Sequence, residues 1–414
     1  MMILKKSAVA GTLEKSDVQV EIEPGSNGIE FTLSSKVMDL YGKQIKKVVL
    51  QTLERLGVKH ARIQVLDNGA LDCIIKARVE CAVFRAAEIT ERLPWGAEIG
   101  EYASFDEENH PMKVEQGTRK NRLRRTMLFL NTHRAKLVKD AFIYKPDCLI
   151  FDLEDAVAEN QKDSARITLY NVLKNIDYKG IERVVRINGW STRHAQEDIR
   201  AAVAGGIDVI RVPKTETADD IYVVEEAIAK AEQEFGVPVG KTLMMGAIES
   251  PLGVINAYSI ATSSTRMMGI SIGAGDYMRT MHSTRTRGGL EMLAARTQLI
   301  IAARAAGVMC FDTVHTDLSD MDWFAKDVQL IKQLGYDGKS LVSPRHIPIV
   351  HQIYTPTPKE IAVAEKEIRS IQEHAQDGIG VFTIDGQMVD VAMMDGARRI
   401  IELAKASGVY EGEL

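Results

Sequence analysis

The chain lacks several features that mark whole classes of protein. It has 414 residues but only four cysteines, Cys73, Cys81, Cys148 and Cys310, and none forms a Cys-x-x-Cys pair. We therefore expect buried thiols in a reducing cytosol, and no zinc site. No apolar run reaches the roughly 18 residues that a membrane span needs, and the N-terminus lacks the apolar core of a signal peptide. A formal net charge of −5 argues against a nucleic-acid-binding surface.

What the chain does contain is a series of short apolar runs that end in charged residues. An apolar run bounded by turn residues predicts a strand buried on both faces of a parallel sheet. Helix-length amphipathic segments separate the runs, and eight such strands in about 220 residues favour an α/β fold of the (β/α)₈ (TIM) barrel type over an open sheet. The predicted strands are residues 127–130, 148–152, 184–187, 209–212, 243–248, 269–273, 308–312 and 340–342.

A small α+β domain is predicted for residues 1–95. Alternation of apolar and polar residues indicates strands, turns rich in Gly and Asn indicate hairpins, and a period of 3.6 indicates a helix. The predicted elements are a hairpin of 17–23 and 29–33, a helix over 37–56 that ends at Gly57, a second hairpin that begins with the strand 61–66, and a segment 71–87 of mixed strand and helix character.

Three further parts follow this domain. Residues 96–121 are charged and have no sustained apolar period, so we interpret them as an exposed linker. The barrel is predicted to span 122–345. A C-terminal extension, 346–414, is expected to hold two helices around a glycine-rich turn at 378–386.

Charged side chains follow the predicted barrel strands, at the end where barrels carry their reactive groups. Glu249 and Asp276 end the fifth and sixth strands, which are neighbours in a barrel. Mg²⁺ is usually held by carboxylates together with water and substrate oxygens, so these two residues predict a magnesium site. Helix-capping or surface carboxylates are the equal alternative. The candidates at strand ends are Glu154, Asp155, Arg186, Lys214, Glu249 and Asp276.

The basic residues at these ends have two interpretations each. Arg186 suits a bidentate grip on a substrate carboxylate, but Arg186 and Lys214 could instead form salt bridges with Glu154, Asp155 or Glu249. Glu154 and Asp155 in turn could orient the metal's waters, hold Arg186, or form a purely structural ion pair.

Two cations are candidates for contact with a coenzyme. The basic stretch 119–125 is either a solvated linker or a segment that binds the phosphates of a coenzyme A-like arm, with Arg124 as the binding residue. Lys214, at the end of the fourth strand, is the other candidate.

Both halves of the chain resemble parts of one enzyme system. Residues 1–95, with Ala-Val-Ala-Gly-Thr-Leu-Glu at 8–14 and Gly-Ala-Leu-Asp-Cys-Ile-Ile-Lys-Ala-Arg at 69–78, resemble the acyl carrier (gamma) subunit of citrate lyase. Residues from about 124 onward resemble its beta subunit, in the citrate lyase/malyl-CoA lyase aldolase family. The segments that carry this second resemblance are 151–155, 185–188, 212–215, 247–253, 273–277, 311–314, 338–341 and 386–390.

The resemblance implies a lyase that cleaves a 3-hydroxy-acyl thioester into an acetyl thioester and an α-keto acid. It implies that Glu249 and Asp276 bind Mg²⁺ and that Arg186 binds substrate. It also implies that Asp390 is an acid/base residue supplied by a neighbouring subunit.

The same resemblance implies partners and leaves alternatives open. We expect a homo-oligomer (trimer or hexamer) that works with a citrate lyase alpha (CoA-transferase) subunit and acts on a citryl thioester. A citramalyl thioester, and a non-catalytic carrier or scaffold subunit, are the alternatives.

Three positions depart from the family pattern. The carrier motif has a serine that bears a phosphoribosyl-dephospho-CoA group, but Lys15 stands there, so either Ser16 is used or the carrier is unmodified. Gly275 replaces a glutamate, which enlarges the site and deletes a charge. The first barrel strand reads Leu-Phe-Leu-Asn-Thr at 128–132, which puts its usual coenzyme contacts in doubt.

Overall fold

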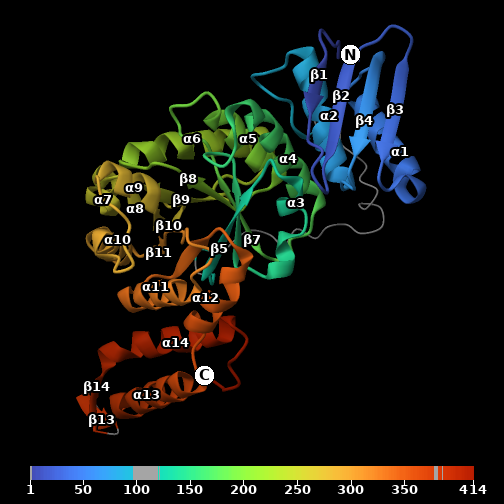
Figure 1. Cartoon of the computed structure of the whole chain (residues 1–414). Helices are drawn as coiled ribbons and strands as arrows, with labels where there is room; N and C mark the ends of the chain where they lie inside the picture. The colour runs from blue at the N-terminus through green and yellow to red at the C-terminus, as the bar shows by residue number, and fades with distance from the viewer. Residues whose placement is uncertain (1, 97–119, 121, 377–380, 385) are drawn as a thin grey trace.

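The structure is a computed structural model that describes residues 2–96, 120, 122–376, 381–384 and 386–414. Its centre is a closed barrel in which every strand runs parallel to its neighbours (Figure 1). The barrel confirms the predicted fold, and each predicted strand overlaps an observed one. The strands are β5 (Thr126–Asn131), β6 (Cys148–Asp152), β7 (Glu182–Arg186), β8 (Val209–Val212), β9 (Leu243–Ile248), β10 (Met267–Ile272), β11 (Met309–Asp312) and β12 (Gly338–Leu341), which pairs with β5.

Helices cover the outside of the barrel (Figure 1). They are α3 (Ala135–Val138), α4 (Lys162–Asn175), α5 (Ala195–Gly205), α6 (Ala218–Glu234), α7 (Pro251–Ile255), α8 (Ala257–Ala261), α9 (Ala274–Thr280), α10 (Leu290–Ala306), α11 (Met321–Leu334) and α12 (Ile347–Tyr354). The strands are apolar on both faces because one face meets these helices and the other meets the barrel interior.

Alternate residues of each strand point into the barrel. Met127, Ile150, Val184 and Val209 form the interior core together with residues of β9, β10 and β11. The side chain two positions further along a strand points the same way, so the charged residues near the C-terminal ends of β6, β7 and β8 face the mouth of the barrel.

The N-terminal domain contains the predicted strands and helix but not the predicted hairpins. Its elements are β1 (Ala8–Ala10), β2 (Val18–Pro24), β3 (Ile29–Ser35), α1 (Met38–Arg55), β4 (Ala61–Asp67) and α2 (Asp72–Ala87), with sheet order β1-β2-β4-β3. β4 lies between β2 and β3 and is parallel to β3, so the first predicted hairpin is wrong. After β4 the chain enters a helix and not a second strand, so the second hairpin is also wrong.

Helix α2 explains the mixed character of residues 71–87. Thirteen of its residues are buried, because it packs against α1 and β2 of its own domain and against α4 of the barrel. A helix covered on several sides is apolar nearly all round and loses the one-sided period by which helices are recognised. This packing also joins the N-terminal domain to the barrel.

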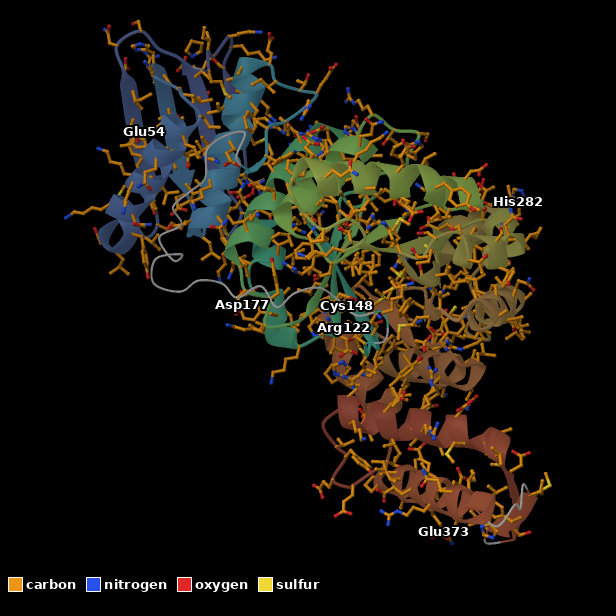
Figure 2. All side chains as sticks on the ribbon, turned by 180° about the vertical axis from the view of Figure 1, so that it is seen from behind. Glu54, Arg122, Cys148, Asp177, His282 and Glu373 are labelled. Carbon is orange, nitrogen blue, oxygen red and sulfur yellow. The ribbon has the colours of Figure 1, made fainter. Side chains whose placement is uncertain are left out.

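The C-terminal segment forms a separate small unit beyond α12 (Figure 1). The two predicted helices are α13 (Pro358–Gln376) and α14 (Met394–Ala406), and the hairpin β13 (Val381–Ile384) and β14 (Gln387–Asp390) lies between them. Seen from behind, Figure 2 shows Glu54 on the N-terminal domain, Cys148 in the barrel and Glu373 in this segment.

Some predicted features lie outside the described residues. These are residues 97–119 and 121 of the predicted linker, and residues 378–380 and 385 of the glycine-rich turn. Across the part of the chain that is described, none of the helices has the length and apolar character that crossing a membrane requires.

Candidate active site at the barrel mouth

The structure brings most of the charged strand-end residues together at the mouth of the barrel. Lys214 follows β8, and its Nζ lies 2.9 Å from Glu154 Oε1, 3.5 Å from Asp155 Oδ1 and 3.8 Å from Asp276 Oδ2. Residues that follow β6, β8 and β10 thus share one cluster. These contacts agree with the salt-bridge interpretation of Lys214, and contact of its half-exposed side chain with a coenzyme stays a prediction.

Arg186, at the end of β7, is held by carboxylates. Its Nε and Nη2 donate to Asp152 at 2.8 and 2.7 Å, and its Nη1 lies 3.0 Å from Glu154 Oε2 and 3.8 Å from Asp155 Oδ2. A guanidinium has five N–H donors, so this pairing leaves donors that can reach a ligand. Asp152, the main partner, was not predicted, although its place two residues after Ile150 points it inward.

Glu249 is the carboxylate at the mouth that has no partner. It is 7% exposed, and within the described part of the chain no hydrogen bond or ion pair reaches its side chain. Burial, the leading cause, raises the pKa of Glu249 to about 7. The backbone of Gly273 passes so close that a Cβ there would lie 2.7 Å from Glu249 Cγ, which explains why this position is glycine.

Asp276 lies in the first turn of α9, next to the strand that neighbours β9. Its Oδ1 lies 2.9 Å from Arg279 Nη2 in an ion pair, and its Oδ2 faces Lys214. Neither carboxylate caps a helix, because α9 begins at the N-cap Gly273 and α7 is capped by Ser250. The capping alternative therefore does not apply to Glu249 or Asp276.

Glu249 and Asp276 form the kind of donor set that a magnesium ion takes. Among the described residues, no group of three or more His, Cys, Asp or Glu side chains is arranged to hold a metal. Glu249 and Asp276 offer two carboxylates, and Mg²⁺ is often bound by one or two carboxylates with water and substrate filling its other positions. Among the described residues, the Glu249 carboxylate is buried and makes no direct ion pair, and such an ion would explain this feature.

A second arginine at the mouth was missed by sequence reasoning. Arg211 lies in β8, opposite Arg186 in the β7–β8 register, and is 3% exposed. Arg211 lies inside an apolar run, whereas the charged residues predicted for the site all lie at the ends of such runs. The signal that could have found it is its inward place, two residues after Val209.

The prediction that Arg124 grips a coenzyme phosphate is wrong. Arg124 precedes β5 and is fully buried at the opposite end of the barrel. Its Nε and Nη2 donate to the two carboxylate oxygens of Glu182 at 2.6 and 2.7 Å. The guanidinium is therefore committed to a structural ion pair far from the strand ends that form the mouth.

The structure adds a condition to the prediction that Ser16 carries a prosthetic group. Ser16 is 7% exposed and has a φ of +66°, in the left-handed region, whereas Lys15 beside it is exposed. The backbone N–H of Ser16 donates to the carbonyl of Asn68. Attachment at Ser16 requires that this turn open, and it stays a prediction.

Asp390 does not belong to the mouth of its own barrel. It ends β14 in the C-terminal segment, which is anchored at the N-terminal ends of the strands. There Arg125 Nη1 donates to Ser407 Oγ at 3.1 Å, and Arg399 pairs with Asp337. The Oδ1 atom of Asp390 is buried and has no hydrogen-bond partner among the described residues.

Comparison with known proteins identifies both halves of the chain. Residues 125–344 match the family described as HpcH/HpaI aldolase/citrate lyase, and residues 5–86 match the acyl carrier family described as malonate decarboxylase delta subunit. The citrate lyase subunit beta of Leuconostoc mesenteroides subsp. cremoris is 50% identical over 292 residues, which are 70% of this chain and 97% of that one.

The chain belongs to the HpcH/HpaI aldolase/citrate lyase family. The citrate lyase subunit beta of Escherichia coli K12 is 43% identical over 293 residues, 71% of this chain and 97% of that one. Among solved structures, protein CitE from Mycobacterium tuberculosis, in complex with magnesium, acetoacetate and coenzyme A, has a TM-score of 0.56 at 26% identity and covers 68% of this chain and 98% of its own.

These findings confirm the predicted resemblance. The chain is a carbon–carbon lyase of the citrate lyase beta subunit type, with an acyl-carrier-like domain at its N-terminus. The site at the barrel mouth is therefore the candidate active site of a lyase.

Proposed function

We propose that the chain cleaves a citryl thioester into an acetyl thioester and oxaloacetate, and that it requires Mg²⁺. The observation that carries the proposal is the buried, unpartnered Glu249 carboxylate beside Asp276 at the mouth of a lyase barrel. The names of the relatives support the citryl group, and the CitE structure with magnesium supports the metal.

Glu249 and Asp276 would hold the metal. When bound, Mg²⁺ would polarise the substrate oxygen that becomes the keto group and so favour loss of its proton. The two carboxylates leave positions for water and for substrate oxygens. Gly273, which has no Cβ, lets the backbone after β10 pack directly against the Glu249 side chain.

The remaining mouth residues would position the substrate and move its hydroxyl proton. Asp152 and Glu154 fix the orientation of Arg186, and the N–H groups of Arg186 that they leave unused would bind a substrate carboxylate. Glu154 is suited to accept the hydroxyl proton, because burial raises its pKa. The carbon–carbon bond then breaks, and its electrons form the enolate of the acetyl thioester.

Protonation of that enolate at carbon would come from Asp390 of a neighbouring protomer. Its own barrel mouth lies at the other end from the C-terminal segment, and its buried Oδ1 has no partner within the described chain. Both facts agree with a residue that works across a subunit boundary in a homo-oligomer. Mixing Asp390→Ala with Asp276→Asn protomers should restore activity that neither variant has alone.

The N-terminal domain would present its thioester from a docked position. Arg78 in α2 is fully buried, and its Nε donates to Asp17 at 2.9 Å, its Nη1 to Ser164 at 2.6 Å and its Nη2 to the carbonyl of His133 at 2.7 Å. One side chain thus ties the Thr12–Asp17 turn to α4 and to the loop after β5.

Surface ion pairs hold the same turn against the same loop. Glu14 pairs with Arg134 at 2.9 Å and with Lys136 at 3.7 Å, both just after β5. Because the loops after parallel barrel strands share one rim, the turn next to Ser16 lies on the rim that carries the active site. We infer that this domain serves its own barrel, and exchange of the acyl group with an alpha (CoA-transferase) subunit would need it to undock.

Release of oxaloacetate from citryl-CoA by the whole chain tests the proposal. The wild type should release it only with Mg²⁺, and Asp276→Asn should lower the rate at least a hundredfold, since a metal ion supplies several kcal/mol of transition-state stabilisation. Asp177→Asn is the matched control, because Asp177 is exposed and, in the described part of the chain, pairs locally with Lys179. Near-normal turnover of Asp276→Asn would refute the metal site, and a wild type without activity or Mg²⁺ binding would favour a scaffold subunit.

A further inference from the structure

Two arginines at the barrel mouth are equivalent in position. Arg186 and Arg211 are register partners on adjacent strands, and both follow an inward-facing valine by two residues. Their guanidinium carbons lie 5.1 and 5.2 Å from the centre of the Phe129 ring, which both arginines therefore contact. Both cations therefore lie near the same opening, with Arg211 the more deeply buried of the two.

The two arginines differ in what neutralises them. Arg186 is held by Asp152 and Glu154. Arg211 donates only from Nη1 to Ser340 Oγ, at 3.3 Å; its Nε has no partner, and no carboxylate of the described chain lies within ion-pair distance. A buried cation without a paired anion is unfavourable. Burial, with Arg186 beside it, lowers the pKa of Arg211 to about 10.

The chemistry of the proposed substrate supplies the missing anion. A citryl thioester carries two free carboxylates, one on the carbon that bears the hydroxyl and one on the CH₂ group that stays with oxaloacetate. A citramalyl thioester has a methyl group in place of that CH₂-carboxylate. If the remaining donors of Arg186 bind the first carboxylate, a substrate with a second one needs a second cation nearby.

We propose that Arg211 binds the second carboxylate of the keto-acid half and so selects a citryl over a citramalyl thioester. The inference rests on the proposed function and adds a specificity-determining residue to it. The guanidinium is planar and offers a fork of donors that matches a carboxylate. Its burial beside Phe129 holds that fork in place before substrate arrives.

A purely structural role makes a different prediction. Glu249 and Asp152 are close enough to influence the charge of Arg211, so its removal could disturb the charge balance of the whole site. Such a disturbance would reduce turnover of every substrate by a similar factor. A carboxylate-binding role affects only the substrate that has the second carboxylate.

The test compares kcat/KM for citryl-CoA and citramalyl-CoA in the whole chain with Mg²⁺. In Arg211→Met the ratio of the two values should fall by at least about 30-fold, because truncating one partner of a buried charge pair is among the largest single binding losses. Most of the loss should be in KM for citryl-CoA. Arg211→Lys should recover part of the ratio, since lysine keeps the charge and loses the fork. Arg183→Met, which removes an arginine from the other end of the neighbouring strand, should leave the ratio unchanged.

Each outcome decides for or against the inference. An equal fall for both substrates, or a wild type that prefers citramalyl-CoA, would overturn it while leaving the lyase function intact. A wild type that cleaves neither substrate would overturn the proposed function itself. Circular dichroism and thermal unfolding show whether Arg211→Met folds. If it does not, calorimetry measures how Arg211→Lys and the wild type bind oxaloacetate and pyruvate. A selective loss of oxaloacetate binding in Arg211→Lys supports the inference, and an equal loss for both acids refutes it.

Discussion

The two ends of the barrel carry the same kinds of residue but pair them differently. At the N-terminal ends of the strands, arginines hold carboxylates with two nitrogen atoms each, at 2.6 to 3.0 Å. One pair links the segment before β5 to β7, two strands away, and the other two link the starts of neighbouring strands. The pairs are Arg124–Glu182, Arg125–Asp147 and Arg183–Asp208.

At the C-terminal ends the pairing is incomplete. Among the described residues, Glu249 is a buried carboxylate and Arg211 a buried guanidinium that make no ion-pair contact, although each lies close enough to affect the other's charge. Lys214 is shared among three carboxylates. The comparison teaches that fully paired charges stabilise the closed barrel, whereas unpaired charges are available to bind ions and substrate.

The largest effect on stability is expected at the N-terminal ends of the barrel strands, where the charge pairs are complete. Arg124→Met should lower the free energy of unfolding by about 3–5 kcal/mol, because it leaves the buried Glu182 without the guanidinium that holds both of its oxygens. The double variant Arg124→Met/Glu182→Met should recover most of the loss, since an apolar pair can replace a buried ion pair at little cost. Urea unfolding of the two variants checks this. A single variant as stable as the wild type would contradict the structural role of the pair.

At the mouth, stability should depend on pH through Glu249. Its pKa is raised to about 7 in the folded protein, so the folded state binds a proton that the unfolded chain has already released. The metal-free protein should therefore lose stability as the pH rises from about 4.5 to 7, by about 3 kcal/mol in total. Saturating Mg²⁺ should remove this loss, because a metal binds the ionised carboxylate.

Unfolding free energies at pH 5, 6, 7 and 8 check this, with Glu249→Gln as the control. The difference between wild type and Glu249→Gln isolates the one titration from all others. A difference that does not change with pH would show that Glu249 is ionised throughout the range.

The smallest effect is expected at Gly275, near the start of α9. A Cβ there would meet no atom within 4 Å, and its φ is not in the left-handed region. Gly275→Ala should therefore stabilise the protein by about 0.5–1 kcal/mol, since glycine in a helix has more conformational entropy to lose. A higher melting temperature for Gly275→Ala than for the wild type would show that the mouth is not optimised for stability. A lower one would contradict the expectation and mean that the fold does not tolerate a side chain at this position.

The barrel could be predicted from the sequence because its strands are buried on both faces. Runs such as 148–151 and 243–248 are apolar without interruption, so their boundaries are visible, and the charged residues that follow them mark the mouth. The pairing of strands in the N-terminal domain could not be predicted in the same way. Alternation shows that 18–24 and 29–35 are strands, but it does not show that β4 inserts between them.

The candidate site was predicted where its residues end strands and missed where they lie inside them. Glu249 and Asp276 stand at visible boundaries, whereas Arg211 lies inside β8; Asp152 ends β6 but was passed over for Glu154 and Asp155, which follow it. Arg124 was misassigned because a basic stretch before a strand resembles a surface linker in sequence. Only the structure shows that its guanidinium turns inward to Glu182.

Calorimetric titration of Mg²⁺ into the metal-free whole chain tests the central claim, that unmatched carboxylates at the barrel mouth form the metal site, most directly. The wild type should bind one ion per chain, and Glu249→Gln and Asp276→Asn should each weaken binding at least tenfold, because each removes one of two charged oxygen ligands. Asp177→Asn should bind as the wild type does. Equal affinity in wild type, Glu249→Gln and Asp276→Asn would contradict the account, because the metal would then be held elsewhere or not at all.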